Sequence, residues 1–316
     1  MPYSVEPISV EVKEELSRFY SKQILYETKS DIYGCCIKLL TGIQWVKDRW
    51  EENFFSMSYS IRSHGRLYVV EDSSKEENTI LYDAQSKTAF LINLDYYGWL
   101  KSLALSVAGD ILEDEHDIFS VHGACLDIKG KGISILGGPG VGKTTHTYGL
   151  LRNSDVRVVS DDWFFSRIFE SMILAFGSER NSYIRADLAK IWPEFKELIE
   201  HAEFDNKQRA VVDLRWVIGK GRIIPFTTLR NIIILKRDSK DSAVCKELDI
   251  KEALKILESN NYFNPHLLVK NKFKRDLRNE FFKALLKVSK TFIVNTIKSP
   301  EESQKIIKQL LEIEKA

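Results

Sequence analysis

The sequence predicts an α/β protein in which a larger α/β unit, residues 118–316, follows a smaller α+β unit, residues 1–117. Three observations predict this arrangement. The apolar run 133–136 leads straight into the glycine-rich segment 137–144, after which a helical pattern begins. Strand-like and helix-like segments alternate from residue 118 onward, as they do in α/β folds. Ahead of them lie hairpin patterns and one long helical pattern, and a length of 316 residues is enough for two cores.

In the first unit we expect mainly strands, then one helix. A strand over 32–40 is followed by a hairpin of 56–63 with 66–70 and a second hairpin of 79–82 with 88–92. The segment 95–112 carries Trp99, Leu103, Val107 and Ile111 at intervals of four, which predicts an amphipathic helix. Its acidic continuation, 113–117, is interpreted as the exposed boundary between the units.

The second unit begins with a predicted hairpin, 120–127 with 131–136, around the turn Lys129-Gly130. Further strands are expected at 171–176, 231–235 and 291–294, and helices at 188–199, broken by Pro193, and at 273–288. The last helix opens on a capping box, with Ser299 as N-cap and Glu302 reaching back.

Composition excludes several classes of protein. Lys plus Arg number 46 and Asp plus Glu number 45, so no broad basic surface indicates a nucleic-acid partner. The four cysteines form no C-x-x-C pattern, which argues against zinc and against a disulfide framework. The sequence has no signal-peptide pattern and no run near the ~20 apolar residues of a membrane span. We therefore expect a cytoplasmic protein without a membrane partner, and a homo-oligomer is compatible with the sequence.

The segment 137–144 completes the pattern G-x-x-x-x-G-K-[ST] between a strand and a helix. In this pattern the glycines turn backbone N–H groups toward phosphate oxygens, the lysine reaches the β- and γ-phosphates, and the hydroxyl ligates Mg²⁺. The lysine, Lys143, is expected to be solvated when no phosphate is bound. ATP and Mg²⁺ are the expected ligands, and the residues expected to contact the nucleotide are Gly138, Pro139, Gly140, Val141, Gly142, Lys143, Thr144 and Thr145.

A second strand-like run, 156–160, ends in Asp161-Asp162. Phosphoryl transfer needs hard oxygen ligands for Mg²⁺ and a proton acceptor for the attacking hydroxyl, and two carboxylates could divide these roles. Asp161 lies 18 positions after Lys143, which leaves room for one helix and a return strand. The alternative is an acidic turn that caps the following segment, 163–165.

Together these segments resemble the HPr kinase/phosphorylase family, whose P-loop fold is akin to that of phosphoenolpyruvate carboxykinases. The resemblance rests on His122-Gly123-Ala124, on 127–130, on 132–137 with the P-loop, and on 158–162, and covers about residues 118–165. It implies that Asp161 is the catalytic base, that Asp162 holds the metal with Thr144, and that His122 and Lys143 lie beside the reacting phosphoryl group.

Two arginines are candidates for the substrate side of the site, because phosphoryl transfer uses cations around the transferring group. Arg185 follows the loop 177–181, and Arg230 closes the loop 225–229 ahead of an apolar strand. Both also occur near the positions of arginine motifs in the family. The alternative for each is a surface arginine that pairs with an acid.

The expected function is an ATP-dependent kinase that transfers the γ-phosphate to a hydroxyl group, with a small metabolite such as free serine or a polyol as acceptor. The sequence departs from the family at Thr145-His146, where an acid is usual, and at Tyr183, where a Glu is usual. A protein-serine kinase/phosphorylase of the HPr kinase type is therefore the first alternative. A non-catalytic nucleotide-dependent regulator is the second. The nearest match to a guanine-reading N-K-x-D motif, 206–209, has Arg in place of the acid.

Overall fold

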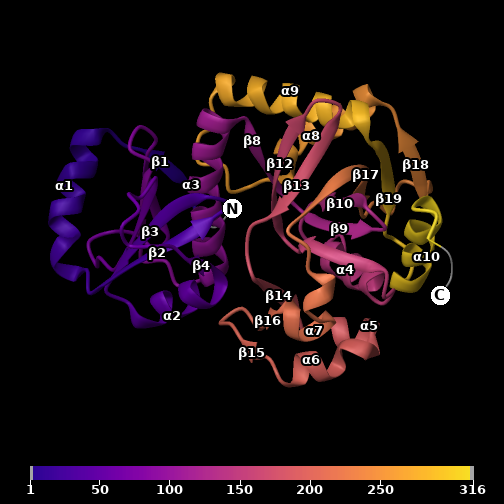
Figure 1. Ribbon diagram of the computed structural model, residues 1–316, viewed down its shortest axis with the longest axis horizontal. Helices are drawn as coiled ribbons and strands as arrows, with labels where there is room; N and C mark the ends of the chain where they lie inside the picture. Colours follow the sequence, from indigo (N-terminus) through magenta and orange to yellow (C-terminus); the bar gives the residue numbers. More distant parts are fainter. Residues whose placement is uncertain (1–2, 314–316) are drawn as a thin grey trace. The chain divides into compact units, whose positions relative to one another are not determined.

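The computed structural model describes residues 3–313, and the protein is a mixed α/β structure with several sheets (Figure 1). The chain divides into two compact units. Unit 1 contains the described residues up to Ile118 together with the short segments 179–181 and 265–271, and unit 2 contains the rest. The expected domains did not include these two short segments in the first unit. The more specific expectation, a kinase fold of the HPr kinase type, stays a prediction.

Unit 1 is built on a seven-stranded mixed sheet with the strand order β1-β6-β7-β5-β3-β2-β4. The hairpin predicted for 79–92 is confirmed as β6 and β7, which pair antiparallel from Thr79↔Ile92. The sequence around residues 32–40 forms two strands, β2 and β3, instead of one, because Tyr33 and Gly34 adopt positive φ and reverse the chain. The bounds are β1 (Val5–Pro7), α1 (Val10–Tyr20), β2 (Tyr26–Ile32), β3 (Cys35–Thr41), α2 (Gln44–Asn53), β4 (Phe55–Ser56), β5 (Gly65–Val70), β6 (Thr79–Asp83), β7 (Thr88–Ile92) and α3 (Tyr97–His116).

The hairpin predicted between 56–63 and 66–70 was wrong. Strand β4 pairs with β2, and β5 pairs in parallel with β3 and β7. The buried side chain of Lys29 explains the loop between β4 and β5, because its Nζ donates to the carbonyls of Tyr59 and Ile61, each at 2.7 Å. These carbonyls are therefore not available for a strand ladder.

Helix α3 was expected to be amphipathic, yet nearly every side chain from Tyr97 to Glu113 is buried. Its polar residues are accommodated by ion pairs within unit 1. Lys101 lies 2.8 Å from Glu179, and Asp110 lies 2.7 Å from Lys87. A charge that loses its water needs such a partner, and both partners come from distant parts of the sequence.

The acidic run 113–117 is exposed from Asp114 onward and lies next to the point after Ile118 where the two units divide, but it is helical and not a linker. Helix α3 continues through His116, Glu113 is buried, and Asp117 ends the helix in a left-handed conformation with φ of 52°. Protease sensitivity at this run, which an exposed linker would cause, is therefore not expected from the structure.

Unit 2 contains a nine-stranded sheet in which β11, β9, β10, β17, β13, β12 and β8 are neighbours in that order, while β19 pairs with β17 and β18 pairs with β19. The carboxyl halves of β10, β17 and β19 run parallel. A separate three-stranded sheet has the order β14-β16-β15. The bounds are β8 (Ile118–His122), β9 (Ala124–Ile128), β10 (Lys131–Gly137), α4 (Lys143–Leu151), β11 (Val156–Ser160), β12 (Trp163–Phe169), β13 (Met172–Gly177), β14 (Asn181–Arg185), α5 (Leu188–Ile191), α6 (Lys196–Glu200), β15 (Glu203–Phe204), β16 (Arg209–Asp213), α7 (Leu214–Ile218), β17 (Phe226–Lys236), β18 (Cys245–Leu248), α8 (Ile250–Ser259), α9 (Lys272–Val288), β19 (Lys290–Asn295) and α10 (Pro300–Leu310).

The large sheet is covered on both faces (Figure 1). Along β17, Ile233 and Leu235 point into the core beneath α4 and α10, while Ile232 and Ile234 point into the core beneath α8 and α9. This alternation is the two-residue period of a strand, and a strand buried on both faces reads as a continuous apolar run. The predicted hairpin around Lys129-Gly130 and the capping box at Ser299 are both present. Among the described helices, none has both the length and the apolar character needed to cross a bilayer.

Candidate functional site

The glycine-rich segment forms a tight loop, residues 137–142, between the carboxyl end of β10 and the start of α4. Here this segment is called the glycine loop. Gly142 is the N-cap residue of α4 with φ of 98°, a conformation that glycine adopts without strain. At Gly137 a Cβ atom would lie 2.8 Å from the carbonyl oxygen of Leu235, so only glycine fits against β17. The N–H groups of the first turn of α4 have no partners within the helix, which makes its N-terminus a favourable place for an anion.

Lys143 begins α4 and folds back over the glycine loop. Its Nζ donates to the carbonyl of Gly137 at 2.8 Å and to that of Gly138 at 3.1 Å. Burial lowers the pKa of Lys143, and the nearby carboxylates of Asp162 and Asp161 partly oppose that shift. The ammonium is therefore held between the loop and the two acids, and the expectation of a solvated lysine was wrong.

The acidic pair occupies the short connection between β11 and β12. Two hydrogen bonds fix this connection: the Ser160 hydroxyl donates to the carbonyl of Trp163, and the N–H of Gly123 donates to the carbonyl of Asp162 at 2.8 Å. Asp161 and Asp162 thus do form a turn, which was the alternative interpretation. Their charges also act on Lys143, so the turn carries its carboxylates to the glycine loop.

His122 is the last residue of β8 and lies beside Asp162. Its Nδ1 is 2.8 Å from the carbonyl oxygen of Phe263, and its Nε2 is 3.3 Å from Asp162 Oδ1. A carbonyl can only accept, so Nδ1 carries a proton and Nε2 faces the carboxylate. The Trp163 ring lies against the imidazole at a centroid distance of 5.5 Å. His122 Nε2 and the Asp162 carboxylate therefore face each other.

The two acids face different neighbours. The charge of Asp161, together with the larger effect of burial, raises the pKa of Tyr148, so this carboxylate lies near the Tyr148 hydroxyl. Tyr148 is four residues after Thr144 and shares its face of α4. Asp162 in turn lies against His122 Nε2. The expected division, with Asp161 as the base and Asp162 as the metal ligand, stays a prediction, and the contact between Asp162 and His122 favours the opposite division.

The oxygen donors near the glycine loop suit Mg²⁺. Within residues 3–313 there is no group of three or more His, Cys, Asp or Glu side chains that could hold a metal by itself. Mg²⁺ does not require one, because it is usually bound through one or two carboxylates and the phosphates of a substrate. The Thr144 hydroxyl, on the first turn of α4, and the carboxylates of Asp161 and Asp162 are the oxygen donors that could contribute to such a site.

The two candidate arginines are not brought into this group. Arg230 lies within β17, where the neighbouring residues Leu229 and Asn231 pair with Gly132 and Ile133 at the amino end of β10. Gly137 pairs with Leu235, so Arg230 is five residues, or ~16 Å, from the glycine loop along the strand.

Arg185 also occupies an ordinary surface position. It is exposed on β14, and its guanidinium lies 3.5 Å from Asp187. This is the surface ion pair of the alternative interpretation.

A different arginine, Arg237, lies at the site and was missed by the sequence reasoning. It directly follows β17, its Nε donates to the carbonyl of Thr296 at 3.1 Å, and its Nη2 lies 4.0 Å from the position that a Cβ on Gly142 would occupy. Thr296 in turn donates through Oγ1 to the carbonyl of Val141 at 2.8 Å. Its position in the sequence could have identified it. Arg237 follows the apolar strand 231–235, whereas Arg230 precedes it, and ligands bind at the carboxyl ends of parallel strands.

The first turns of α4 are supported from below by buried polar contacts. His146 lies beneath Gly142, and its Nδ1 is 2.8 Å from Oε1 of Gln304 on α10. Burial lowers the pKa of His146, the bond to Gln304 opposes this shift, and the charge of Arg237 adds to it. The indole N–H of Trp192 donates to the carbonyl of Thr145 at 2.8 Å. His146, where the family usually has an acid nearby, is thus a structural residue.

Comparisons with known proteins leave the family open. No protein-family model matches the chain, and no curated protein matches it in sequence. Among solved structures, the HPr(Ser) kinase/phosphatase from Coxiella burnetii aligns with 61% of this chain and 88% of its own, with 12% identity and a TM-score of 0.36. This similarity is too distant to show a shared fold or activity, so the function must be inferred from the residues of this chain.

Proposed function

We propose that the protein is an ATP-dependent kinase that transfers the γ-phosphate to a hydroxyl group. The observation that carries this proposal is the convergence of Lys143, Asp161, Asp162 and His122 around a glycine loop at a helix N-terminus. This combination offers a phosphate site, a metal site and a proton acceptor within one small region, which are the parts that phosphoryl transfer requires.

The glycine loop, Lys143 and Arg237 would hold the phosphates. Backbone N–H groups at the start of α4 supply oriented dipoles, and the two side chains supply positive charge. Lys143 already lies over the loop, so it needs only to exchange the carbonyls of Gly137 and Gly138 for phosphate oxygens. Thr144 and Asp161 would hold Mg²⁺, which supplies charge neutralisation at the phosphate oxygens when it is bound.

The proton of the acceptor hydroxyl would go to the Asp162–His122 pair. As that proton leaves, the acceptor oxygen forms a bond to the γ-phosphorus, and the bond from the γ-phosphorus to the β–γ bridging oxygen breaks. The products are a phosphate monoester and ADP. The hydrogen bond from His122 Nδ1 to Phe263 orients Nε2 toward Asp162, so the pair can accept one proton without moving.

A small hydroxyl metabolite, such as free serine or a polyol, is the acceptor that we favour. The reason is the departures from the HPr kinase pattern at Thr145-His146 and Tyr183, the first of which the buried contact of His146 accounts for structurally. A seryl side chain of a protein is the competing acceptor.

The proposal is tested by incubating the protein with Mg²⁺, ATP labelled at the γ-phosphate and a panel of hydroxyl metabolites. We expect label in one metabolite class with the parent protein and none with Lys143→Ala. Lys129→Ala is a matched control, because Lys129 is exposed and pairs only loosely with Asp155 at 3.4 Å. Nucleotide binding without transfer to a metabolite or a protein would replace the kinase with a nucleotide-dependent regulator.

A further inference from the structure

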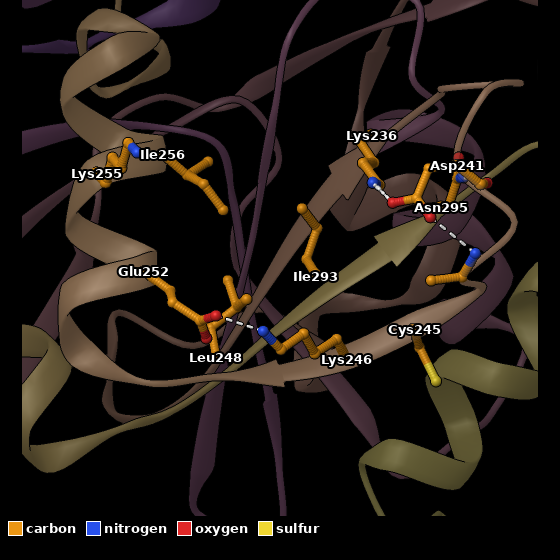
Figure 2. A pocket seen from close by; sticks show the side chains of 11 residues that line it. Lys236, Asp241, Cys245, Lys246, Leu248, Glu252, Lys255, Ile256, Ile293 and Asn295 are labelled. Atoms are coloured by element: carbon orange, nitrogen blue, oxygen red, sulfur yellow. Dashed lines mark hydrogen bonds and ion pairs between the residues drawn. The ribbon is translucent and has the colours of Figure 1, made fainter.

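Unit 2 contains a cavity of about 310 Å³ between α8, β18 and the carboxyl ends of β17 and β19. Figure 2 shows it from close by, with the side chain of Ile293 in the middle and that of Ile256 projecting from α8. Leu248, Ile256 and Ile293 give it an apolar floor, Ala243 lies at its exposed edge, and Asn295 is a buried part of its wall. This volume is at the lower end of the range of small-molecule sites, which is about 300–1,000 Å³.

The cavity is adjacent in the chain to the residues that contact the glycine loop. Lys236 lines the cavity and is followed by Arg237, while Asn295 lines it and is followed by Thr296. Because side chains alternate along a strand, the first residue of each pair faces the cavity and the second faces α4 and the glycine loop. The cavity and the proposed phosphate site therefore lie on opposite faces of the sheet, at the same carboxyl edge.

The spacing suits the two halves of one nucleotide. Strand β19 is two strands away from β10, with β17 between them, so the cavity rim lies ~10 Å to one side of the strand that leads into the glycine loop. The opposite flank of β10 carries β9 and β11 and, beyond them, Asp161 and Asp162. A phosphate acceptor that reacts beside Asp161 and Asp162 would occupy the flank of β9 and β11. The flank of β17 and β19 would then be left for the nucleoside part of the phosphate donor.

From this placement we infer that the cavity is the subsite for the base and ribose of the nucleoside triphosphate. The inference rests on the proposed function, because it places the other end of the molecule whose phosphates bind at the glycine loop. Apolar side chains on the floor would contact the face of the base, and the ribose and phosphates would cross the carboxyl edge of the sheet toward Arg237 and Thr296.

The polar side chains that line the cavity determine how it would recognise a nucleotide base. Lys236 pairs with Asp241, and Lys246 pairs with Glu252. The Asn295 side chain donates to the carbonyls of Asp238 and Asp241 at 2.9 and 2.8 Å. These groups already bind one another, whereas Lys255 lines the cavity from an exposed position. Recognition therefore depends mainly on apolar contact and on one ammonium group. ATP and GTP are therefore expected to bind with affinities within about tenfold of each other.

The experiment compares ATP with inorganic tripolyphosphate, which has the phosphates without the nucleoside. Two variants change the cavity: Ile256→Ala removes part of its floor, and Ala243→Phe fills its rim from an exposed position that does not endanger folding. The control is Ile250→Ala, an exposed residue of the same helix outside the cavity. Both cavity variants should weaken ATP binding about tenfold, equivalent to about 1.4 kcal/mol, and leave tripolyphosphate binding within twofold.

The outcomes separate this inference from the proposed function. If Lys143→Ala weakens both ligands but Ile256→Ala and Ala243→Phe weaken neither, the cavity is not the base subsite and the phosphate site stands. If Lys143→Ala weakens neither ligand, both proposals are wrong. Photolabelling of the parent protein with 8-azido-ATP should mark peptides within residues 243–256, and labelling confined to other peptides would overturn the inference.

Discussion

Replacing Lys143 by alanine should destabilise the protein as well as weaken phosphate binding. In the structure Nζ makes two hydrogen bonds to the carbonyls of Gly137 and Gly138 and lies near the carboxylates of Asp161 and Asp162. Hydrogen bonds that involve a charged group contribute about 1.5–3 kcal/mol each. The substitution also removes the free-energy cost of burying the ammonium, which offsets much of this loss. We expect the free energy of unfolding to fall by about 1–2 kcal/mol in Lys143→Ala.

The effect on ligand binding should be larger. A triphosphate would lose charge-assisted hydrogen bonds of about 2–4 kcal/mol, which corresponds to a 30- to 1,000-fold loss of affinity. Chemical denaturation of the ligand-free protein and calorimetry with Mg-ATP measure the two effects on the same sample. Lys129→Ala is the control, and an exposed pair of this kind should change stability by less than about 1 kcal/mol.

Two results would refute this reasoning. An unchanged free energy of unfolding in Lys143→Ala would mean that the lysine is solvated in the ligand-free protein, as the sequence alone suggests. Affinity for Mg-ATP within a few-fold of the parent would mean that the glycine loop does not bind phosphate.

Three further predictions follow from the same region and from the cysteines. Asp162→Asn should keep the affinity for Mg-ATP and reduce turnover by roughly 10²–10⁴-fold, the usual contribution of a general base. Asp161→Asn should instead weaken Mg-ATP binding, and added Mg²⁺ should restore it. Equal effects of the two variants in kinetic and binding assays would contradict the assignment of Asp162 as base and Asp161 as metal ligand. The pKa of His146 is lowered from 6.5 in the folded state, so the unfolded chain takes up a proton first and stability should fall as the pH drops below about 6.5. His146→Asn should flatten that decline in melting temperature, and an unchanged slope would assign it to other groups. A maleimide should modify Cys245 rapidly in the native protein, because Cys245 is exposed whereas the other three cysteines are buried and have raised pKa values. Cys245→Ser is the control, and fast labelling of a second thiol would contradict the fold.

Features determined by neighbouring residues could be predicted from the sequence alone. The turn at Lys129-Gly130, with φ of 53° and 81°, and the capping box of Ser299 and Glu302 are local structures whose residue preferences act over four residues or fewer. The glycine loop is local in the same sense, because the conformation that Gly142 adopts is accessible mainly to glycine.

Features that depend on strand register and distant partners were decided only by the tertiary structure. The position of Arg237 after the strand was available in the sequence, but only the parallel pairing of β17 with β10 brings that end of the strand to the glycine loop. The orientation of His122 depends on a carbonyl 141 residues away, at Phe263.

The burial of α3 has the same origin. Its helical periodicity could be recognised in the sequence. Its charged residues Asp110 and Lys101 can be buried because they form ion pairs with Lys87 and Glu179. Local propensity therefore determined which segments are helices, strands and turns, whereas long-range pairing determined which faces are buried and which charges meet at the site.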